Sequence, residues 1–324
     1  MDETMIGIDI GGTTVKIGLL TKEGDIAQKW EIPTNRENLG KHIVDDIWRS
    51  VSSKLTELHI AKDKLIGIGV GAPGFTDKNT GVVHEAVNVG WKDYDLAAQL
   101  QERSGLPVFV ENDANMVALG ENWKGGGNRA KDLIAITLGT GVGSGIIANG
   151  EILSGTNGTA GEIGHIIADP NGYPCNCGRT GCLDTVASAT GIVRQAMEQM
   201  KDDPNGALAA LYNNKGTIDA KDVFDAARQG DPGCERVIRR IADLLGFVLA
   251  GAAAVINPSI IVIGGGVSQA GDQLLRPVID SFRTYSLPRI SRACEINIAR
   301  LGNDAGMIGA AYLVMQQTQK GMYR

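Results

Sequence analysis

Hydrophobic runs separated by glycine turns dominate the first half of the chain. Strands are predicted by the apolar runs at 5–10, 15–20, 27–32, 65–71 and 107–110. Apolar residues at helical spacing predict helices at 44–58 and 95–103, and Gly105 is placed to cap the second of them. This order of elements indicates an α/β unit that opens with a hairpin.

The second half of the chain restarts the same pattern. A strand at 133–139 runs into a glycine turn at 140–145 and a returning strand, and two later strands are expected at 259–266 and 295–300. Helices are expected at 187–200, at 220–229, at about 235–256 and after Asp304. The second half therefore indicates another α/β unit.

Two internal repeats support a duplication. IDIGGTTVKIG (8–18) matches ITLGTGVGSGI (136–146) in its strand, glycine turn and strand, and NDANMVALG (112–120) resembles NDAGMIGAA (303–311). We expect a small α/β domain of residues 1–117 plus 304–324 and a large α/β domain of residues 118–303. A ligand would then bind in the cleft between them, where such sites concentrate.

Composition and charge exclude several classes of protein. The chain has 324 residues, a net charge of -6 and a pI near 5.3, without the basic run expected of a nucleic-acid binder. The longest apolar stretch, 244–256, is too short to span a bilayer, and the N-terminus lacks a signal-peptide pattern. Three of the five cysteines cluster, which favours metal binding in a reducing cytoplasm over disulfides.

The two glycine turns are candidates for phosphate binding. Asp9-Ile10-Gly11-Gly12-Thr13-Thr14 would expose backbone N–H groups and hydroxyls to an anion, and the carboxylate of Asp9 could hold hydrated magnesium. The turn lacks the lysine of a P-loop, and the strand that follows excludes a dinucleotide fingerprint. Each turn alone could be a plain hairpin, but the recurrence at 138–143 favours phosphate binding.

Two further segments are candidates for chemistry. Glu111-Asn112-Asp113-Ala114-Asn115 follows a buried strand and opens a helix, at the strand end where open α/β sheets place catalysis, although Asp113 could instead be an N-cap. Ile263-Gly264-Gly265-Gly266-Val267 offers a flat glycine surface for a base or ribose, or is a generic strand-to-helix loop.

The clustered cysteines predict a structural metal site. Cys175, Cys177 and Cys182 lie close together in a glycine-rich segment, and His165 lies upstream. Four protein ligands leave no open position on a tetrahedral ion, which is typical of structural zinc. The alternative is three free thiols. Cys234 and Cys294 are isolated and are expected to be ordinary buried residues.

Taken together, these motifs resemble those of the ROK family (repressor, open reading frame, kinase). The matching order is DxGGT, GAPG (71–74), ENDAN, LGTGVGSG, GEIGH (161–165), CxCGxxGC and GGG, and it spans residues 6 to about 311. The resemblance implies an actin-like, hexokinase-like (ribonuclease H-like) two-domain α/β fold with an interdomain cleft, and ATP-dependent phosphorylation of a hexose at its 6-hydroxyl. NVGW (88–91) and TVASATGI (185–192) resemble the glucokinase branch, which implies glucose.

The resemblance also implies roles for individual residues. Asp113 would be the general base. The residues implied to bind sugar are Gly74, Asn112, Asp113, Glu162, His165 and Asp184. The implied zinc ligands are His165, Cys175, Cys177 and Cys182. ATP with Mg²⁺ is implied to bind Asp9, Gly11, Gly12, Thr13, Thr14, Lys16, Gly139, Thr140, Gly141, Gly143, Gly264, Gly265 and Gly266.

Asp184 is a departure from the family pattern. The family usually has a glutamate two residues after the last zinc cysteine, and the aspartate here is shorter by one methylene. Asp184 would reach the sugar directly or through water. The alternative is a surface residue or an N-cap of the helix that follows.

Three other functions compete with a glucose kinase. A ROK repressor would carry an N-terminal helix-turn-helix, for which a first strand beginning by Met5 leaves no room. A ROK kinase could act on N-acetylmannosamine, N-acetylglucosamine, fructose or allose, and polyphosphate could replace ATP. The cysteine cluster and GEIGH disfavour an actin-like ATPase. We expect a cytoplasmic homo-oligomer, a dimer or a tetramer, that binds neither nucleic acid nor membrane.

Overall fold

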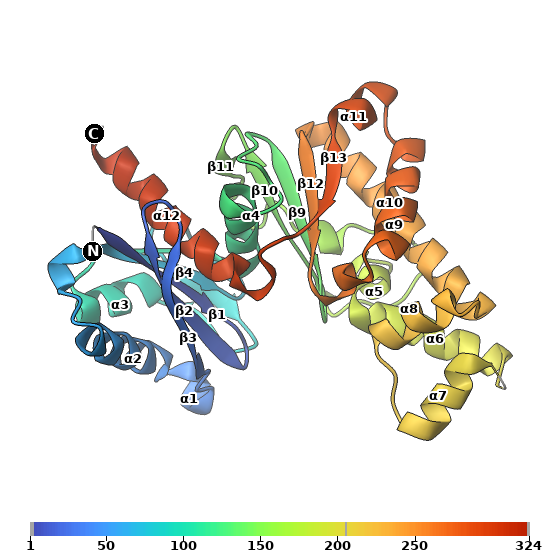
Figure 1. Ribbon diagram of the computed structural model, residues 1–324, viewed down its shortest axis with the longest axis horizontal. Helices are drawn as coiled ribbons and strands as arrows, with labels where there is room; N and C mark the ends of the chain where they lie inside the picture. Colours follow the sequence, from blue (N-terminus) through green and yellow to red (C-terminus); the bar gives the residue numbers. More distant parts are fainter. Residues whose placement is uncertain (1–2, 205, 323–324) are drawn as a thin grey trace.

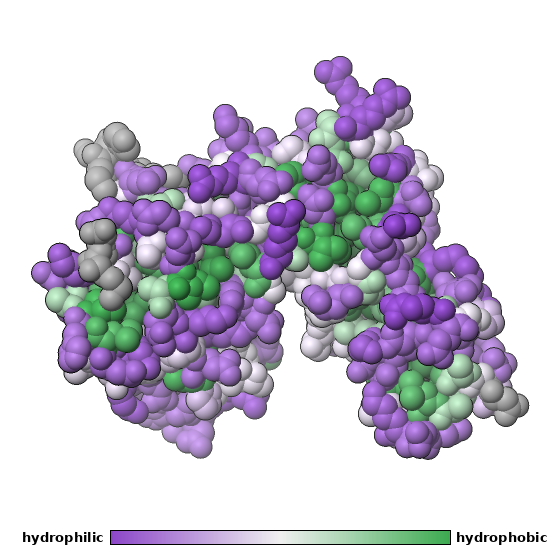
Figure 2. Space-filling model, in the orientation of Figure 1, coloured by the Kyte–Doolittle hydropathy of each residue, from purple (hydrophilic) through white to green (hydrophobic). Residues whose placement is uncertain are grey.

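The protein has two lobes, each built on a five-stranded sheet (Figure 1). The structure is a computed structural model and describes residues 3–204 and 206–322. The space-filling view shows the lobes meeting along the upper part of the molecule, with an open notch between them below (Figure 2). This arrangement provides the interdomain cleft that was expected from the sequence.

The sheet of the first lobe has the strand order β3-β2-β1-β4-β8. Its strands are β1 (Thr4–Ile10), β2 (Thr14–Thr21), β3 (Ile26–Pro33), β4 (Leu65–Ala72) and β8 (Val108–Asn112). Strands β1, β2 and β3 pair antiparallel, whereas β4 pairs parallel with both β1 and β8. The hairpin and the buried strands predicted from the sequence are confirmed.

The sheet of the second lobe repeats this topology in the order β11-β10-β9-β12-β13. Its strands are β9 (Leu133–Leu138), β10 (Val142–Ala148), β11 (Glu151–Ile152), β12 (Ile260–Gly264) and β13 (Glu295–Ile298). The first three pair antiparallel, and β12 pairs parallel with both β9 and β13. The same order and the same directions in both sheets match the sequence repeats.

Short elements and the outer helices complete the first lobe. They are α1 (Glu37–Gly40), α2 (Ile43–Glu57), η1 (Lys62–Lys64) and α3 (Leu96–Ser104). Gly105 caps α3 in the left-handed conformation at φ 62°, as predicted. A separate antiparallel sheet contains β5 (Phe75–Thr76), β6 (Val83–Ala86) and β7 (Trp91–Tyr94). Sequence analysis missed this sheet because strands of two to four residues are too short to show a period.

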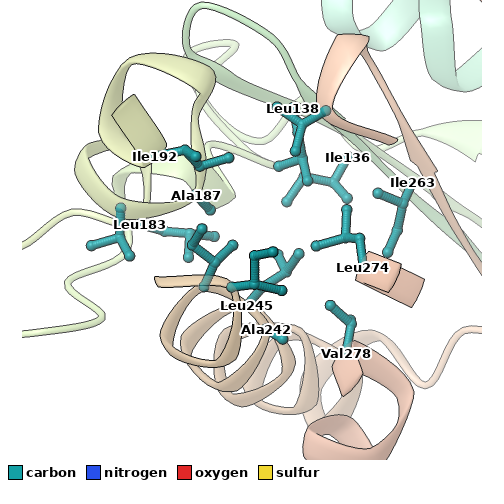
Figure 3. Close-up of a cluster of buried hydrophobic side chains, with 14 of the residues drawn as sticks. Ile136, Leu138, Leu183, Ala187, Ile192, Ala242, Leu245, Ile263, Leu274 and Val278 are labelled. Atoms are coloured by element: carbon teal, nitrogen blue, oxygen red, sulfur yellow. The ribbon is translucent and has the colours of Figure 1, made fainter. Parts of the chain in front are cut away.

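Helices cover the second sheet on the side that holds its core. They are α5 (Asp184–Ala187), α6 (Ala189–Asp202), α7 (Ala207–Lys215), α8 (Ala220–Arg228), α9 (Pro232–Ile256), α10 (Asp272–Tyr285) and α11 (Pro288–Ala293), with 3-10 turns η2 (Ile163–His165) and η3 (Gly266–Ala270). Ile136 and Leu138 of β9 face Leu245 of α9 and Leu274 of α10 across this core (Figure 3). Helix α7 was missed, whereas α10 is the helix that was expected, without bounds, after the glycine loop at 263–267.

Two helices cross between the lobes. Helix α4 (Asp113–Lys124) follows the first sheet but packs on β9 and β10 of the second. Helix α12 (Ala305–Met322), which follows η4 (Gly302–Asp304), follows the second sheet but packs on β1 and β4 of the first. Glycines let the two helices pack closely against each other. A Cβ added to Gly120 would lie 2.1 Å from the carbonyl oxygen of Ala305, and one added to Gly309 would lie 1.8 Å from that of Met116.

Among the described residues, no helix combines the length and apolar character that crossing a bilayer requires.

Candidate active site and metal cluster

The first glycine turn joins β1 to β2. Gly11 donates its N–H to the carbonyl of Thr14 at 2.9 Å, and the Thr34 hydroxyl donates to the carbonyl of Gly11 at 2.7 Å. Asp9 lies opposite Lys16 in the strand register, and burial raises the pKa of Asp9 while Lys16 opposes the rise. Asp9 is therefore a partly buried acid near the end of β1, directly before the glycine turn.

The crossing helix α12 begins against this acid. A Cβ added to Gly306 would lie 2.7 Å from the carboxyl carbon of Asp9, so only glycine allows the approach. Lys16 donates its ammonium to the carbonyl of Asn303 at 3.2 Å, and Lys29 pairs with Asp304 at 2.6 Å. The first lobe is thereby fixed to the segment that enters α12.

The second glycine turn joins β9 to β10 and is held by the segment after the cysteines. The N–H of Val142 donates to Oδ1 of Asp184 at 2.7 Å. Ala189 N–H donates to the carbonyl of Gly139 at 2.8 Å, and the Thr190 hydroxyl donates to the carbonyl of Thr140 at 2.9 Å. Three bonds therefore fix the turn to the start of α5 and α6.

The glycine loop after β12 lies beside the second turn. Gly265 adopts a φ of 84°, and a Cβ there would lie 2.4 Å from the carbonyl oxygen of Leu138, at the end of β9. The loop therefore needs glycine for both conformation and contact. The second and third predicted ATP segments share one surface of the second lobe.

Asp113 lies where β8 ends and α4 begins. Asn112 is the N-cap of α4, and its Oδ1 accepts N–H groups from Ala114 and Asn115 at 2.9 and 3.2 Å. The alternative that Asp113 is the N-cap is therefore wrong. Oδ1 of Asp113 accepts the Ala114 N–H at 2.8 Å.

The surroundings of Asp113 favour its protonated form. Burial, the largest cause, acts together with the nearby carboxylates of Asp9 and Glu162 to raise the pKa of Asp113 to about 6, against the opposing hydrogen bond from the Ala114 N–H. Within the described part of the chain, no lysine or arginine forms an ion pair with Asp113. A carboxyl group with a pKa close to neutral is suited to proton transfer.

Gly74, Asn112 and Glu162, three of the residues expected to bind sugar, lie near Asp113. Nδ2 of Asn112 donates to the carbonyl of Gly74 at 3.0 Å, and Gly74 has a φ of 86° that places it against the Glu85 carbonyl. The Ser144 hydroxyl donates to the carbonyl of Gly161 and accepts the N–H of Ile163 at 3.0 Å. These contacts fix the GAPG and GEIGH segments beside the first turn of α4, while the roles of their residues stay predictions.

His165 and three cysteines form one cluster whose ligand atoms all lie within 4.8 Å of each other. Nδ1 of His165 lies 3.7 Å from Sγ of Cys175, and Sγ of Cys177 lies 3.5 Å from Sγ of Cys182. A tetrahedral zinc ion with bonds of about 2.0–2.3 Å separates its ligand atoms by about 3.5–3.8 Å. The residues therefore fit a tetrahedral metal.

The loop that carries these cysteines is fixed to the helices behind it. Arg240 of α9 pairs with Asp169 at 2.6 Å, and the guanidinium of Arg194 lies 4.9 Å from the ring centre of Tyr173. Cys234 and Cys294 are buried in the second lobe away from the cluster, as expected.

Asp184 is half-buried and does not cap α5, because the structure gives that helix no side-chain cap. The N-cap alternative is therefore wrong. One oxygen of the carboxylate binds the second glycine turn through Val142. Its other oxygen is left to reach a sugar hydroxyl, a role that stays a prediction.

Glu111, for which the sequence indicated no separate role, is buried directly before the Asn112–Asp113 pair. Its carboxylate contacts Thr76 at 3.3 Å and Ser154 at 3.5 Å. A charged residue at the end of a strand that is otherwise buried was the signal available in the sequence.

Comparisons with known proteins place these features in a family. A glucokinase of Halalkalibacterium halodurans is 53% identical over 317 residues, which cover 98% of this chain and 96% of that protein. The crystal structure of a ROK family glucokinase from Streptomyces griseus in complex with glucose and AMPPNP has 38% identity and a TM-score of 0.79, covering 97% of this chain and 99% of that one. A ROK family transcriptional regulator, described as a homologue of the E. coli MLC protein, has 27% identity and a TM-score of 0.85 over 97% of this chain and 78% of its own. The family model for ROK proteins matches residues 5–317, and the chain belongs to the ROK family.

Proposed function

We propose that the chain transfers the γ-phosphoryl group of ATP to the 6-hydroxyl of glucose, with Asp113 as the general base. The observation that carries the proposal is the position of Asp113, an acid with a pKa raised to about 6. It lies at a strand end between the two glycine turns. The identity of 53% with a glucokinase over nearly the whole chain supports both the reaction and the sugar.

The chemical step needs positioning and charge neutralisation more than covalent chemistry. Asp113 accepts the proton of the 6-hydroxyl as the oxygen attacks phosphorus, a role worth on the order of 10²–10⁴ in rate. The two glycine turns lie against the phosphates, which accept hydrogen bonds from those N–H groups of the turns that have no partner within the protein, unlike Gly11, Gly139 and Val142. Closure of the proposed domains, 1–117 plus 304–324 against 118–303, excludes water as a competing acceptor. Residues 1–2 and 323–324 of this division lie outside the described residues.

Magnesium and zinc complete the proposed site. The half-buried carboxylate of Asp9 and the hydroxyls of Thr13 and Thr14 are the oxygen donors that Mg²⁺ prefers. When bound with ATP, Mg²⁺ supplies charge neutralisation at the phosphates. The cluster of three cysteines and His165 fits structural Zn²⁺. Because Nδ1 of His165 faces the thiols, its Nε2 is left for a sugar hydroxyl.

The cellular setting follows from composition and surface. A cluster of free thiols fits a reducing cytoplasm, and the net charge of -6 disfavours nucleic acid as a partner. Phe247, Val255, Tyr285 and Leu287 are large apolar residues exposed on and beside α9 and α10. They support a homo-oligomer, a dimer or a tetramer. Light scattering on the purified protein measures its mass.

The deciding experiment is ADP release from the purified enzyme across a panel of hexoses and hexosamines. We expect glucose to give the highest kcat/KM. A higher value for N-acetylmannosamine, N-acetylglucosamine, fructose or allose would reassign the substrate. Sugar-independent ADP release would contradict kinase function. Replacing ATP with polyphosphate in the same assay measures the range of phosphoryl donors.

A further inference from the structure

The carboxylate of Glu111 is buried at the junction of the two lobes. The residue is 4% exposed and ends the buried stretch of β8, two positions before Asp113. No ion pair joins it to a lysine or arginine in the part of the chain that the structure describes. Burying an unpaired charge is costly unless several donors solvate it, so its partners define what it does.

One oxygen of Glu111 collects three donors around the proposed base. Oε1 accepts the backbone N–H of Asn112 at 2.9 Å, Nδ2 of Asn115 at 3.1 Å and the hydroxyl of Thr76 at 3.3 Å. The first donor is the peptide that leads into Asp113. The second donor, Asn115, lies in the first turn of α4. The carboxylate therefore fixes the orientation of the strand end and of the helix on which Asp113 is carried.

The two hydroxyl groups that contact Glu111, those of Thr76 and Ser154, come from segments of different lobes. Thr76 belongs to β5 of the first lobe and is 3% exposed. Ser154 follows β11 of the second lobe, is 5% exposed and has its hydroxyl 3.5 Å from Oε2. Thr76 lies two residues after Gly74, whose carbonyl accepts the side chain of Asn112. One carboxylate thus joins a segment of each lobe to the start of α4.

We propose that Glu111 is a positioning residue that holds Asp113 and Asn112 in register with the sugar-binding segments of both lobes. The inference rests on the proposed role of Asp113. It assigns Glu111 no proton transfer and no contact with sugar or ATP. A buried network of this kind specifies a single arrangement when every member is satisfied, and the charged acceptor strengthens each of its hydrogen bonds.

The test is a double-mutant cycle between positions 111 and 113. Glu111→Gln keeps the size and one carbonyl acceptor but removes the charge and turns an NH2 group toward hydroxyls. We expect kcat for glucose to fall about tenfold while the KM for ATP changes by less than twofold. In the Asp113→Asn background, Glu111→Gln should change the residual kcat by less than twofold, because its effect passes through the base.

The outcomes separate this inference from the proposed function. Near-normal turnover of Asp113→Asn alone would remove the base, and with it the proposed mechanism. If Asp113→Asn is slow but Glu111→Gln leaves kcat unchanged, only the role of Glu111 is overturned. The same conclusion follows if Glu111→Gln lowers kcat by the same factor in the wild type and in Asp113→Asn. If Glu111→Gln does not fold, Thr76→Val carries the same test, since it removes one donor to Oε1 and leaves the charge.

Discussion

Replacing Asp113 with asparagine should make the protein more stable while it abolishes most activity. The side chain keeps its shape, and its oxygen still accepts the N–H of Ala114. What disappears is a recessed carboxyl group whose pKa rises from 3.8 to about 6. At 1.36 kcal/mol for each pKa unit, that rise destabilises the folded state by at most about 3 kcal/mol at pH 7.

The pH dependence of this difference follows from the direction of the shift. Because the pKa of Asp113 is higher in the folded protein, the folded state binds more protons than the unfolded state between pH 3.8 and about 6. The stability that Asp113 contributes is therefore fully present below pH 3.8 and is lost as the pH rises through about 6. The advantage of Asp113→Asn, about 3 kcal/mol at pH 7, should fall to roughly half of that at pH 5.

Urea unfolding of the wild type and the variant at pH 8, 7, 6 and 5 measures this difference directly. Asp77→Asn is the matched control, because the hydrogen bond from the Asn79 N–H lowers the pKa of Asp77 and the loss of this carboxylate should give no stabilisation. In parallel, kcat of Asp113→Asn should fall by roughly 10²–10⁴. A variant less stable than the wild type at every pH, or a difference that does not vary with pH, would refute the reasoning.

Three further predictions concern the same site. The kcat/KM for glucose should fall on the acid side of a midpoint near pH 6, where Asp113 of the free enzyme becomes protonated, and a flat profile down to pH 5 would contradict the base assignment. Cys177→Ser should lose bound zinc by elemental analysis and weaken glucose binding without complete unfolding, whereas Cys234→Ser, outside the cluster, should retain the metal. Asp184→Ala removes the acceptor of the Val142 N–H and should raise the KM for ATP about fivefold to tenfold, while Asp184→Asn, which keeps an acceptor, should change it little. If the second oxygen of Asp184 binds sugar, the KM for glucose rises in the Ala variant as well.

Much of the architecture could be predicted because its elements are long and patterned. The hairpins, the buried strands and α9 carry periodic apolar residues, and the repeats revealed that one topology occurs twice. The three-stranded sheet β5–β7 could not be predicted, since its pairing depends on tertiary contacts between segments of two to four residues. A helix was expected after the glycine loop at 263–267, but its bounds could not be given, because α10 contains an internal proline, Pro277, which usually signals a break.

The candidate site was also predictable only where its residues lie close together in the sequence. Motif spacing was sufficient to bring His165 and the three cysteines together in advance, because these ligands lie close in sequence. The contact between Asp184 and Val142 joins residues 42 positions apart, and spacing gives no indication of it. The network of Glu111 is likewise non-local, because Thr76 and Ser154 come from opposite lobes and are far from Glu111 in the sequence.

The repeated topology gives the molecule two equivalent corners, and they have diverged. Each crossing helix begins at an Asn-Asp-Ala sequence, but the acid of the second copy, Asp304, is neutralised by Lys29 on the eight-residue strand β3. The corresponding strand of the other half, β11, has only two residues and presents no such lysine to Asp113. The same Asn-Asp-Ala sequence thus carries an ion pair at one corner and an acid without an ion pair at the other, among the described residues. Shortening β3 so that Lys29 is removed would leave Asp304 as a second unpaired acid at the equivalent position of the other half, a starting point for new chemistry in the same scaffold.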